Sequence, residues 1–268
     1  MEFREVLFKV PASEFDRVSV EVFEAGALGV EILSEGNEVL FKAFFRGNSR
    51  LPDGLKAFLV SESILKERDW NEEWKKHFRP LRITERIWVA PSWEKGKFVE
   101  PEGSLVLYIY PGRGFGTGTH ETTQLVIELI EETLNPGDSF LDVGTGSGIL
   151  SILSKRLGAQ KVVACDIQEG IEEEFFKNCS LNGVSEITFI EGSVDRVSGT
   201  FDLVVANIEK HLLLPLLEGI YERTGKRAIF SGILTSQREE FLEELKKVGF
   251  KPLSERCKGE WMAFLCEK

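Results

Sequence analysis

Three glycines, Gly144, Gly146 and Gly148, alternate with other residues between an apolar strand-like run and a helix-like run. A strand that turns through glycines into a helix brings backbone N–H groups beside a nucleotide-sized ligand. The spacing is GxGxG, whereas dinucleotide-binding turns have GxGxxG. Asp142, just before the turn, suits a ligand that carries an ammonium group and no pyrophosphate. S-adenosylmethionine is such a ligand, and a plain tight turn is the alternative interpretation.

Two polar side chains end further strands of the same region. Asp166 ends an expected strand at 161–166, 18 residues after Gly148, where a carboxylate can accept both ribose hydroxyl groups of a nucleoside. Asn207 follows an expected strand at 201–206. Because ligands bind outside the carboxyl ends of strands in open α/β sheets, we expect its amide at the mouth of the site, near the transferable group. A helix cap and a plain turn are the respective alternatives.

The third strand of this region, expected at 186–190, ends before Ser193 and Asp195. Its place in the alternating pattern brings this strand end to the same edge of the sheet. Either side chain could there meet an adenine ring.

A second glycine cluster lies in residues 111–123, with four glycines at alternate positions. Such a segment cannot form a comfortable strand or helix. We therefore expect a mobile loop that covers the ligand, and a flexible connector is the alternative. The loop leads into a helix whose first turn holds Thr122 and Thr123. His120, a single histidine in this loop, is interpreted as structural and not as a base.

The elements that must position these groups follow a regular pattern. From a helix at 120–134 to a helix at 235–248, helices and strands alternate. Alternating βα units predict a parallel sheet wrapped by helices. Two final strands at 250–257 and 260–266 have no helix between them, which predicts an antiparallel edge.

The N-terminal part has a different pattern. Residues 1–67 predict a small α+β unit with no obvious chemistry, and residues 68–80 predict a linker helix. Trp70 and Trp74 lie on one face of that helix because they are four residues apart. Their packing on a domain is the simpler interpretation, and contact with a substrate is the alternative. Residues 81–268 hold all the groups that could do chemistry.

Composition narrows the classes of partner. The chain has 268 residues, of which 42% are hydrophobic, and a net charge of −11. This charge argues weakly against nucleic acid as the main partner and suits a basic protein substrate. The ordinary acidity of a soluble protein is the alternative interpretation. The four cysteines lack CxxC spacing and the three histidines are scattered, so neither a metal site nor a disulfide framework is expected. No apolar run could span a membrane, and the N-terminus does not resemble a signal peptide, so we expect a cytoplasmic protein.

Taken together, these motifs resemble the ribosomal protein L11 methyltransferase (PrmA) family. The loop 111–123 is the most discriminating segment. The resemblance implies an α/β, class I (Rossmann-like, seven-stranded) methyltransferase domain at 81–268, behind a small N-terminal α+β domain at 1–67 that recognises the substrate. The matching segments are Asp69–Trp74, Phe78–Pro80, Pro91–Trp93, Pro111–Thr123, Leu141–Leu150, Asn207–Ile208 and Ser231–Leu234.

The resemblance also implies an S-adenosylmethionine-dependent protein-lysine N-methyltransferase. Its substrate would be a large-subunit ribosomal protein, methylated on lysine side chains and on the N-terminal amine. The family's cofactor contacts correspond to Thr123, Gly144, Asp166 and Asn207, and Gly146 joins them as part of the same turn. We expect a monomer that needs no metal, no nucleic acid and no membrane. A methyltransferase that acts on RNA or on a small-molecule amine is the alternative.

Several positions depart from the family pattern. Gln168 and Glu169 follow Asp166 where the family usually has another acid and a proline. Glu172–Glu174 stand where small residues are common, and Glu209 follows Asn207-Ile208 where an apolar or small residue is usual.

The expected reaction is an in-line displacement at the methyl carbon of a sulfonium. A lysine amine has a pKa of roughly 10.4, so removing its proton at pH 7 costs about 4.6 kcal/mol. A nearby sulfonium and a dry site both lower that pKa. Because no His/Asp pair suggests a base, we predict that Asn207 and nearby carbonyl groups position the amine without one. The Asn207-Ile208 sequence, in place of Asn-Pro-Pro-aromatic, argues against adenine or glutamine amides as acceptors.

Overall fold

The computed structural model describes residues 2–34, 36–46, 51–66 and 78–268. The chain divides into two compact units, Met1–Phe78 and Arg79–Lys268. The predicted linker helix, with Trp70 and Trp74, lies outside the described residues up to position 77, and residues 78–80 form neither helix nor strand. The recognition role of the first unit stays a prediction.

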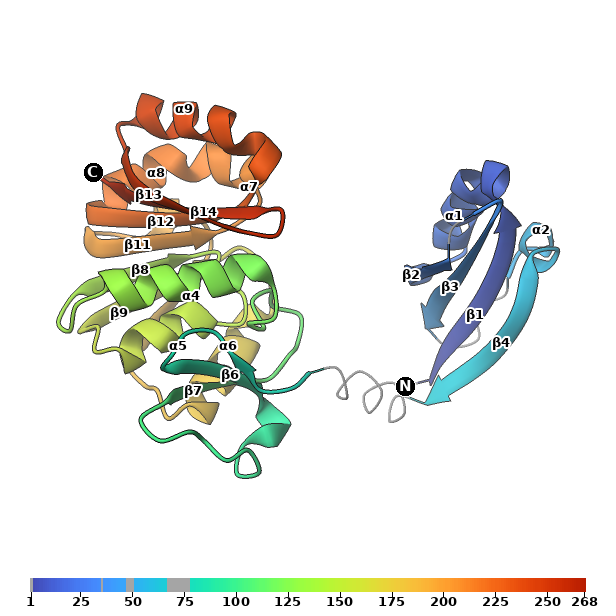
Figure 1. Cartoon of the computed structure of the whole chain (residues 1–268), viewed down its shortest axis with the longest axis horizontal. Coiled ribbons are helices and arrows are strands. Elements are labelled where there is room, and N and C mark those ends of the chain that lie inside the picture. The colour runs from blue at the N-terminus through green and yellow to red at the C-terminus, as the bar shows by residue number, and fades with distance from the viewer. Residues whose placement is uncertain (1, 35, 47–50, 67–77) are drawn as a thin grey trace. The chain divides into compact units, whose positions relative to one another are not determined.

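The first unit is a four-stranded antiparallel sheet with helix α1 on one face (Figure 1). Val6, Phe8 and Val10 alternate along β1 and share a buried core with Val18 and Val22 of α1. Buried residues are two positions apart along the strand and four positions apart along the helix, as side-chain geometry requires for one face of each element. The strand order is β2-β3-β1-β4. The elements are β1 (Glu2–Pro11), α1 (Phe15–Glu24), β2 (Ala27–Ser34), β3 (Glu38–Arg46), α2 (Asp53–Lys56) and β4 (Leu59–Lys66).

The second unit contains a seven-stranded sheet in the order β10-β9-β8-β11-β12-β14-β13. Its strands are β8 (Ser139–Val143), β9 (Lys161–Asp166), β10 (Ile187–Glu191), β11 (Phe201–Asn207), β12 (Thr224–Leu234), β13 (Lys251–Lys258) and β14 (Trp261–Glu267). Five strands run parallel, and β14 pairs antiparallel with both β12 and β13. The predicted parallel sheet with an antiparallel edge is therefore confirmed.

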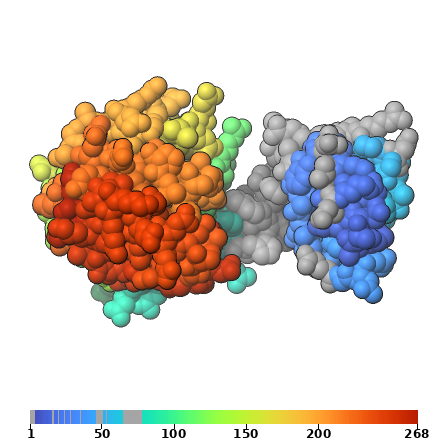
Figure 2. Space-filling view, turned by 90° about the horizontal axis from the view of Figure 1, so that it is seen from above, coloured from blue at the N-terminus to red at the C-terminus, as the bar shows by residue number. Residues whose placement is uncertain are grey.

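Helices cover both faces of this sheet (Figure 1). They are α4 (Glu121–Thr133), α5 (Ile149–Arg156), α6 (Ile171–Leu181), α7 (Lys210–Leu213), α8 (Leu217–Arg223) and α9 (Arg238–Val248). The first three share one apolar core with the sheet, and the last three share another. Successive strand residues such as Leu203 and Val204 belong to opposite cores, because side chains alternate across a strand. In Figure 2, the elements from α9 onward, coloured red, cover the centre of the visible face of this unit.

One predicted helix is interrupted. The sequence pattern predicts a single helix at 210–223, but a 3-10 turn at Leu214–Leu216 separates α7 from α8. Pro215 occupies that turn. Proline has no N–H group to donate and its ring clashes with the preceding turn of an α-helix, so the continuous helix cannot form.

A smaller sheet precedes the large one. It consists of β5 (Leu81–Arg82), β6 (Ile87–Pro91) and β7 (Leu105–Ile109). Asn178 of α6 accepts the backbone N–H of Tyr110, and Asn182, which caps the C-terminal end of α6, accepts that of Tyr108, each at 2.8 Å. These bonds fix the start of the glycine-rich segment 111–118 against α6. Among the described helices, none has the length and apolar composition needed to cross a membrane.

Candidate active site

A pocket of about 330 Å³ lies at the carboxyl ends of β8, β9 and β11. We call it the carboxyl-end pocket. The strand order reverses between β8 and β11, which is where doubly wound sheets bind ligands. Four of the predicted site residues, Gly144, Gly146, Asp166 and Asn207, line it, and the fifth, Thr123, does not. The other lining residues are Phe115, His120, Thr122, Gln168, Ile208, Glu209, Leu212, Gly232 and Trp261.

The glycine turn after β8 is shaped by close packing. Gly146 has a φ of +52°, and a Cβ atom there would lie 2.4 Å from the carbonyl oxygen of Phe115. Gly144 has a φ of +70°, and its Cβ would lie 2.8 Å from the side chain of Ile208. A left-handed backbone combined with such close approach requires glycine. The turn therefore sits tightly between the glycine-rich loop and the end of β11.

The N–H groups of this turn face the protein, and the prediction that they face a ligand is wrong. All five from Gly144 to Gly148 donate to acceptors within the chain. Gly144 donates to the carbonyl oxygen of Cys165 at 2.8 Å, and Gly146 donates to Oδ2 of Asp166 at 2.9 Å. Because the neighbouring strand and loop use these donors, polar contacts to a ligand must come mainly from side chains.

Asp142 lies beneath the turn and is fully buried. Its Oδ2 accepts hydrogen bonds from the hydroxyl groups of Thr145 and Ser151, each at 2.7 Å. Burial raises the pKa of Asp142 to about 6, against the opposing effect of these two hydrogen bonds. Asp142 is not among the lining residues. Its Oδ2 ties the turn to α5, whereas its Oδ1 is buried and has no hydrogen-bond partner among the described residues. The contact with a ligand's ammonium group stays a prediction.

Asp166 ends β9 with its carboxylate held in place. Oδ2 accepts the N–H of Gly146 and Oδ1 accepts the N–H of Gln168, both at 2.9 Å. The residue that caps the following helix is Gly170, which removes the helix-cap alternative for Asp166. Each carboxylate oxygen can accept more than one hydrogen bond. A rigid, partly exposed carboxylate of this kind suits a pair of neighbouring hydroxyl groups.

The glycine-rich loop 111–118 is hydrogen-bonded to two other segments, the glycine turn and α6. Ser147 donates from its N–H to the carbonyl oxygen of Phe115 at 2.9 Å and from its hydroxyl to that of Gly116 at 2.6 Å. Glu174 of α6 accepts the N–H groups of Arg113 at 2.7 Å and Gly114 at 3.1 Å. The loop is thus bonded to the turn and to α6.

Glu174 is a residue whose role the sequence reasoning missed. It stands where the family pattern has small residues, and the structure gives it the function of a loop anchor. Its carboxylate carries the charge that strengthens bonds from backbone N–H groups. The sequence signal that could have indicated this role was the unusual run of glutamates at Glu172–Glu174, in a chain whose loop 111–118 has many glycines with backbone N–H groups to bind.

His120 has the structural role that was predicted. It caps α4, with Nδ1 accepting the N–H of Thr122 at 3.3 Å. Nδ1 also lies 2.9 Å from the hydroxyl of Thr122. The imidazole stands edge-on between Phe115 and Trp261, with ring centroids 5.2 and 5.1 Å away. These contacts hold the ring as part of an aromatic wall of the pocket, to which Trp261 comes from the far end of the chain.

The side-chain amide of Asn207 has a hydrogen bond on its nitrogen and none, among the described residues, on its oxygen. Its Nδ2 donates to the hydroxyl of Thr123 at 3.4 Å, and Thr123 is fully buried. Its Oδ1 is inaccessible to water and has no hydrogen-bond partner among the described residues. Such an acceptor is costly to leave unpaired. Thr123 therefore orients the amide, and Oδ1 is the acceptor that a ligand's N–H group can satisfy.

The remaining site predictions differ from the observed lining. Ser193 and Asp195, considered for an adenine contact, do not line the carboxyl-end pocket, whereas Gln168 does. Thr122, and not Thr123, faces it from α4. Leu212 and Trp261 also line it, and neither carries a motif that could have identified it from sequence.

Comparison with known proteins identifies the family. A family model described as ribosomal protein L11 methyltransferase (PrmA) matches residues 41–268. This chain belongs to that family. A relative of the same name from Exiguobacterium sp. is 38% identical over 78% of this chain and 68% of its own length. Another from Dictyoglomus turgidum is 33% identical over 100% of this chain and 99% of its own.

A solved structure agrees with the family assignment. The ribosomal protein L11 methylase of Lactobacillus delbrueckii subsp. bulgaricus aligns with a TM-score of 0.66 at 30% identity, over 70% of this chain and 98% of that one. The class I methyltransferase fold predicted from the sequence is confirmed, as is the prediction of a PrmA-family methyltransferase that uses S-adenosylmethionine.

The pocket suits that cofactor chemically. S-adenosylmethionine carries a sulfonium, an ammonium group and a ribose. The described lining residues include two carboxylates, Asp166 and Glu209, and no lysine or arginine. Asp166 is partly buried and Glu209 is exposed, so Asp166 is the carboxylate whose attraction for a cation is less weakened by water. Asp166 is the lining residue whose fixed carboxylate fits the ribose.

Proposed function

We propose that this protein transfers methyl groups from S-adenosylmethionine to lysine side-chain amines and the N-terminal amine of ribosomal protein L11. The observation that carries the acceptor chemistry is Oδ1 of Asn207, a desolvated hydrogen-bond acceptor. Among the described residues it has no partner, and none of those that line its pocket is a lysine or an arginine. An amine N–H is its natural complement. The relatives named above, which carry this substrate in their names, support the choice of protein.

The predicted site residues then take distinct roles. Asp166 accepts the ribose hydroxyl groups. Gly144 and Gly146 keep the turn packed against Ile208 and the Phe115 backbone, because any side chain there would collide with these neighbours, and this packing shapes the wall that the nucleoside meets. Thr123 acts on Asn207 and not on the cofactor, since it is buried and bonded to the amide. Asn207 holds the acceptor amine.

The chemistry assigned to these residues is alignment. The bound donor supplies a methyl carbon made electrophilic by its positively charged sulfur. Oδ1 of Asn207 accepts one N–H of the neutral amine, which directs the nitrogen lone pair toward that carbon. Holding two reactants in line supplies a large share of the barrier reduction, worth roughly 7–11 kcal/mol in well-oriented systems.

We propose that no side chain serves as a dedicated base. His120, which is the one histidine among the described lining residues, uses Nδ1 in capping α4. Its ring is held between two aromatic side chains. The proton of the lysine ammonium leaves to water before the amine enters the dry part of the pocket, where desolvation favours the neutral form. The monomeric state and the cytoplasmic location stay predictions.

The test combines mass spectrometry and calorimetry. Purified L11 incubated with enzyme and isotope-labelled S-adenosylmethionine should gain labelled methyl groups on lysines and on the N-terminus. The Asn207→Ala variant should lose about 100-fold in turnover, equivalent to about 3 kcal/mol, while its affinity for S-adenosylmethionine changes by less than about threefold. Absence of label on L11 would refute the substrate. Full turnover by Asn207→Ala would refute the positioning role.

A further inference from the structure

Glu209 is a second carboxylate in the pocket, two residues after Asn207. It follows Asn207 and Ile208 at the end of β11, and it caps the short helix α7. It lines the carboxyl-end pocket, yet its side chain is 69% exposed. Glu209 therefore stands at the rim, where an incoming substrate meets it before reaching Asn207.

The carboxylate of Glu209 is largely unused within the protein. Among the described residues, its only ion-pair partner is His211, whose Nδ1 lies 3.5 Å from Oε2 and attracts it only when protonated. The adjacent cation, Lys210, pairs with Glu240 instead. Asp166, in contrast, already accepts a backbone N–H on each oxygen. Of the two carboxylates, Glu209 has the greater capacity left for a new cation.

The surroundings favour a cation with an apolar stem. Ile208, Leu212 and Trp261 line the same pocket as Glu209. A lysine side chain has four methylene groups that can lie along such a wall while its charged end reaches a carboxylate. Because no lysine or arginine occurs among the described lining residues, the protein offers Glu209 no competing positive charge from within the pocket.

We propose that Glu209 is a specificity-determining residue that captures the acceptor in its protonated, cationic form at the rim of the pocket. This inference rests on the proposed function, in which the acceptor is an amine. Capture precedes loss of the proton and the transfer of the neutral amine to Asn207. It thus selects cationic amines over neutral groups of the same size.

Glu209 does not act as the base in this scheme. A glutamate has a pKa of roughly 4.3 and a lysine of roughly 10.4, so the carboxylate takes the ammonium proton only very rarely. Its contribution is electrostatic attraction during binding. The effect of removing its charge therefore falls on the KM for the protein substrate and leaves kcat nearly unchanged.

The first test compares Glu209→Gln with Glu218→Gln. Glu218 lies on α8, is exposed, and is not part of the pocket, so its variant removes the same charge elsewhere in the same unit. Glu209→Gln should raise the KM for L11 about fivefold, with kcat and S-adenosylmethionine affinity within about twofold of wild type. The increase should shrink at high salt, because salt screens exposed charges. Glu218→Gln should match wild type.

A second test does not depend on L11. With S-adenosylhomocysteine bound, n-butylammonium and n-butanol are titrated against wild type and Glu209→Gln, with binding followed by NMR. Wild type should prefer the ammonium, and the variant should lose at least about threefold of that preference. If L11 is methylated but neither the KM nor this preference changes in the variant, the role of Glu209 is refuted. If L11 is not methylated but the preference depends on Glu209, the L11 proposal fails and the cation site stands.

Two further outcomes also decide the matter. If n-butylammonium does not bind wild type better than n-butanol, the rim does not select cations and the inference is overturned. If Glu209→Gln weakens S-adenosylmethionine binding and leaves the KM for L11 unchanged, Glu209 belongs to the cofactor contacts, and its assignment to the acceptor is wrong.

Discussion

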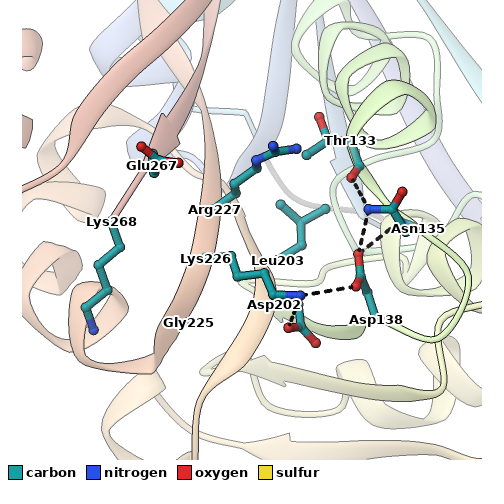
Figure 3. Close-up of a pocket in the computed structure, with 10 residues that line it drawn as sticks. All are labelled: Thr133, Asn135, Asp138, Asp202, Leu203, Gly225, Lys226, Arg227, Glu267 and Lys268. Carbon is teal, nitrogen blue, oxygen red and sulfur yellow. Dashed lines mark hydrogen bonds and ion pairs between the residues drawn. The ribbon is translucent and has the colours of Figure 1, made fainter.

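Two pockets of similar volume lie at opposite ends of the seven-stranded sheet. The carboxyl-end pocket measures about 330 Å³, and a pocket at the amino ends of β11 and β12 measures about 360 Å³. Figure 3 shows this second one, which we call the amino-end pocket. Its lining residues are Thr133, Asn135, Asp138, Asp202, Leu203, Gly225, Lys226, Arg227, Glu267 and Lys268.

The two pockets differ in whether their polar side chains are already paired within the protein. In the amino-end pocket, Nζ of Lys226 lies 2.9 Å from Asp202 and 3.8 Å from Asp138 (Figure 3). Asp202 also accepts the N–H of Ser139 at 2.8 Å. In the carboxyl-end pocket, Oδ1 of Asn207 has no partner among the described residues. Unmet hydrogen-bonding capacity, and not volume, distinguishes the candidate active site.

The largest effect should come from a methyl group that forces the glycine-rich loop away from the turn. Gly146→Ala places a Cβ 2.4 Å from the carbonyl oxygen of Phe115 at a left-handed backbone position, so the loop must move. We expect S-adenosylmethionine affinity to fall roughly 100-fold, or about 3 kcal/mol, by calorimetry. Gly183→Ala is the control, because its φ of +63° is similar but a Cβ there meets nothing within 4 Å. Equal losses in both variants would contradict the steric argument.

Removing the fixed carboxylate should have the next largest effect. Asp166→Ala deletes the proposed ribose acceptor and the partner of the Gly146 N–H. Affinity for S-adenosylmethionine should fall about 30-fold, or about 2 kcal/mol. Asp195→Ala, which removes a carboxylate outside the pocket, should bind the cofactor as wild type does. A normal affinity in Asp166→Ala would show that the ribose is held elsewhere.

A smaller effect is expected from releasing the glycine-rich loop. Glu174→Ala leaves the N–H groups of Arg113 and Gly114 without their acceptor, so the loop spends more time away from the turn. S-adenosylmethionine affinity should fall about fivefold, or about 1 kcal/mol, and hydrogen exchange in 111–118 should accelerate. Glu173→Ala is the matched control, since that neighbour is exposed on the same helix. Unchanged exchange in Glu174→Ala would refute the anchor.

The amino-end pocket should contribute to stability and not to activity. Hydrogen bonds from Ser139, and the ion pair with Lys226, lower the pKa of Asp202 to about 2. Because its pKa in the folded state lies below the unfolded value of roughly 3.9, this stabilisation is present at neutral pH and is lost as pH falls from about 4 to about 2.

Asp202→Asn should therefore keep full methyltransferase activity and lose about 1 kcal/mol of unfolding free energy at pH 7, discounted for partial exposure of the pair. Urea denaturation at pH 7 and at pH 3 measures the free energy of unfolding of both proteins. The difference in this free energy between the variant and wild type should be smaller at pH 3 than at pH 7. A loss of activity in a stably folded Asp202→Asn protein would mean that the two pockets are functionally connected.

The fold was predictable because local patterns determine it. The alternating apolar runs place strands and helices of the larger unit within a few residues of their observed bounds, and the predicted antiparallel edge is confirmed. The break at Pro215 was foreseeable from proline chemistry. The sequence pattern also predicts a strand at 227–231, whereas β12 runs over Thr224–Leu234. This extension was not foreseeable, because Thr224 pairs with Phe201 of β11 and Leu234 pairs with Trp261 of β14, and both partners lie on other segments.

The site was predictable only in part. Gly144, Gly146, Asp166 and Asn207 were found because strand ends meet at one edge of a parallel sheet, and all four line the pocket. The direction of the turn's N–H groups was predicted wrongly, because the acceptors that claim them lie on other segments. Glu174 was also missed for this reason, since a contact between α6 and a loop 60 residues earlier leaves no periodic signature.

The aromatic wall of the pocket has a consequence for the timing of folding. His120 opens α4, whereas its ring neighbour Trp261 opens the last strand. That strand, β14, must also insert between β12 and β13, so β13 has no sheet partner until β14 has emerged. During translation, a nascent chain can order β8 to β11 first, but it cannot complete the wall until β14 has left the ribosome. Competence to bind substrate therefore depends on a strand made after all the others of this sheet.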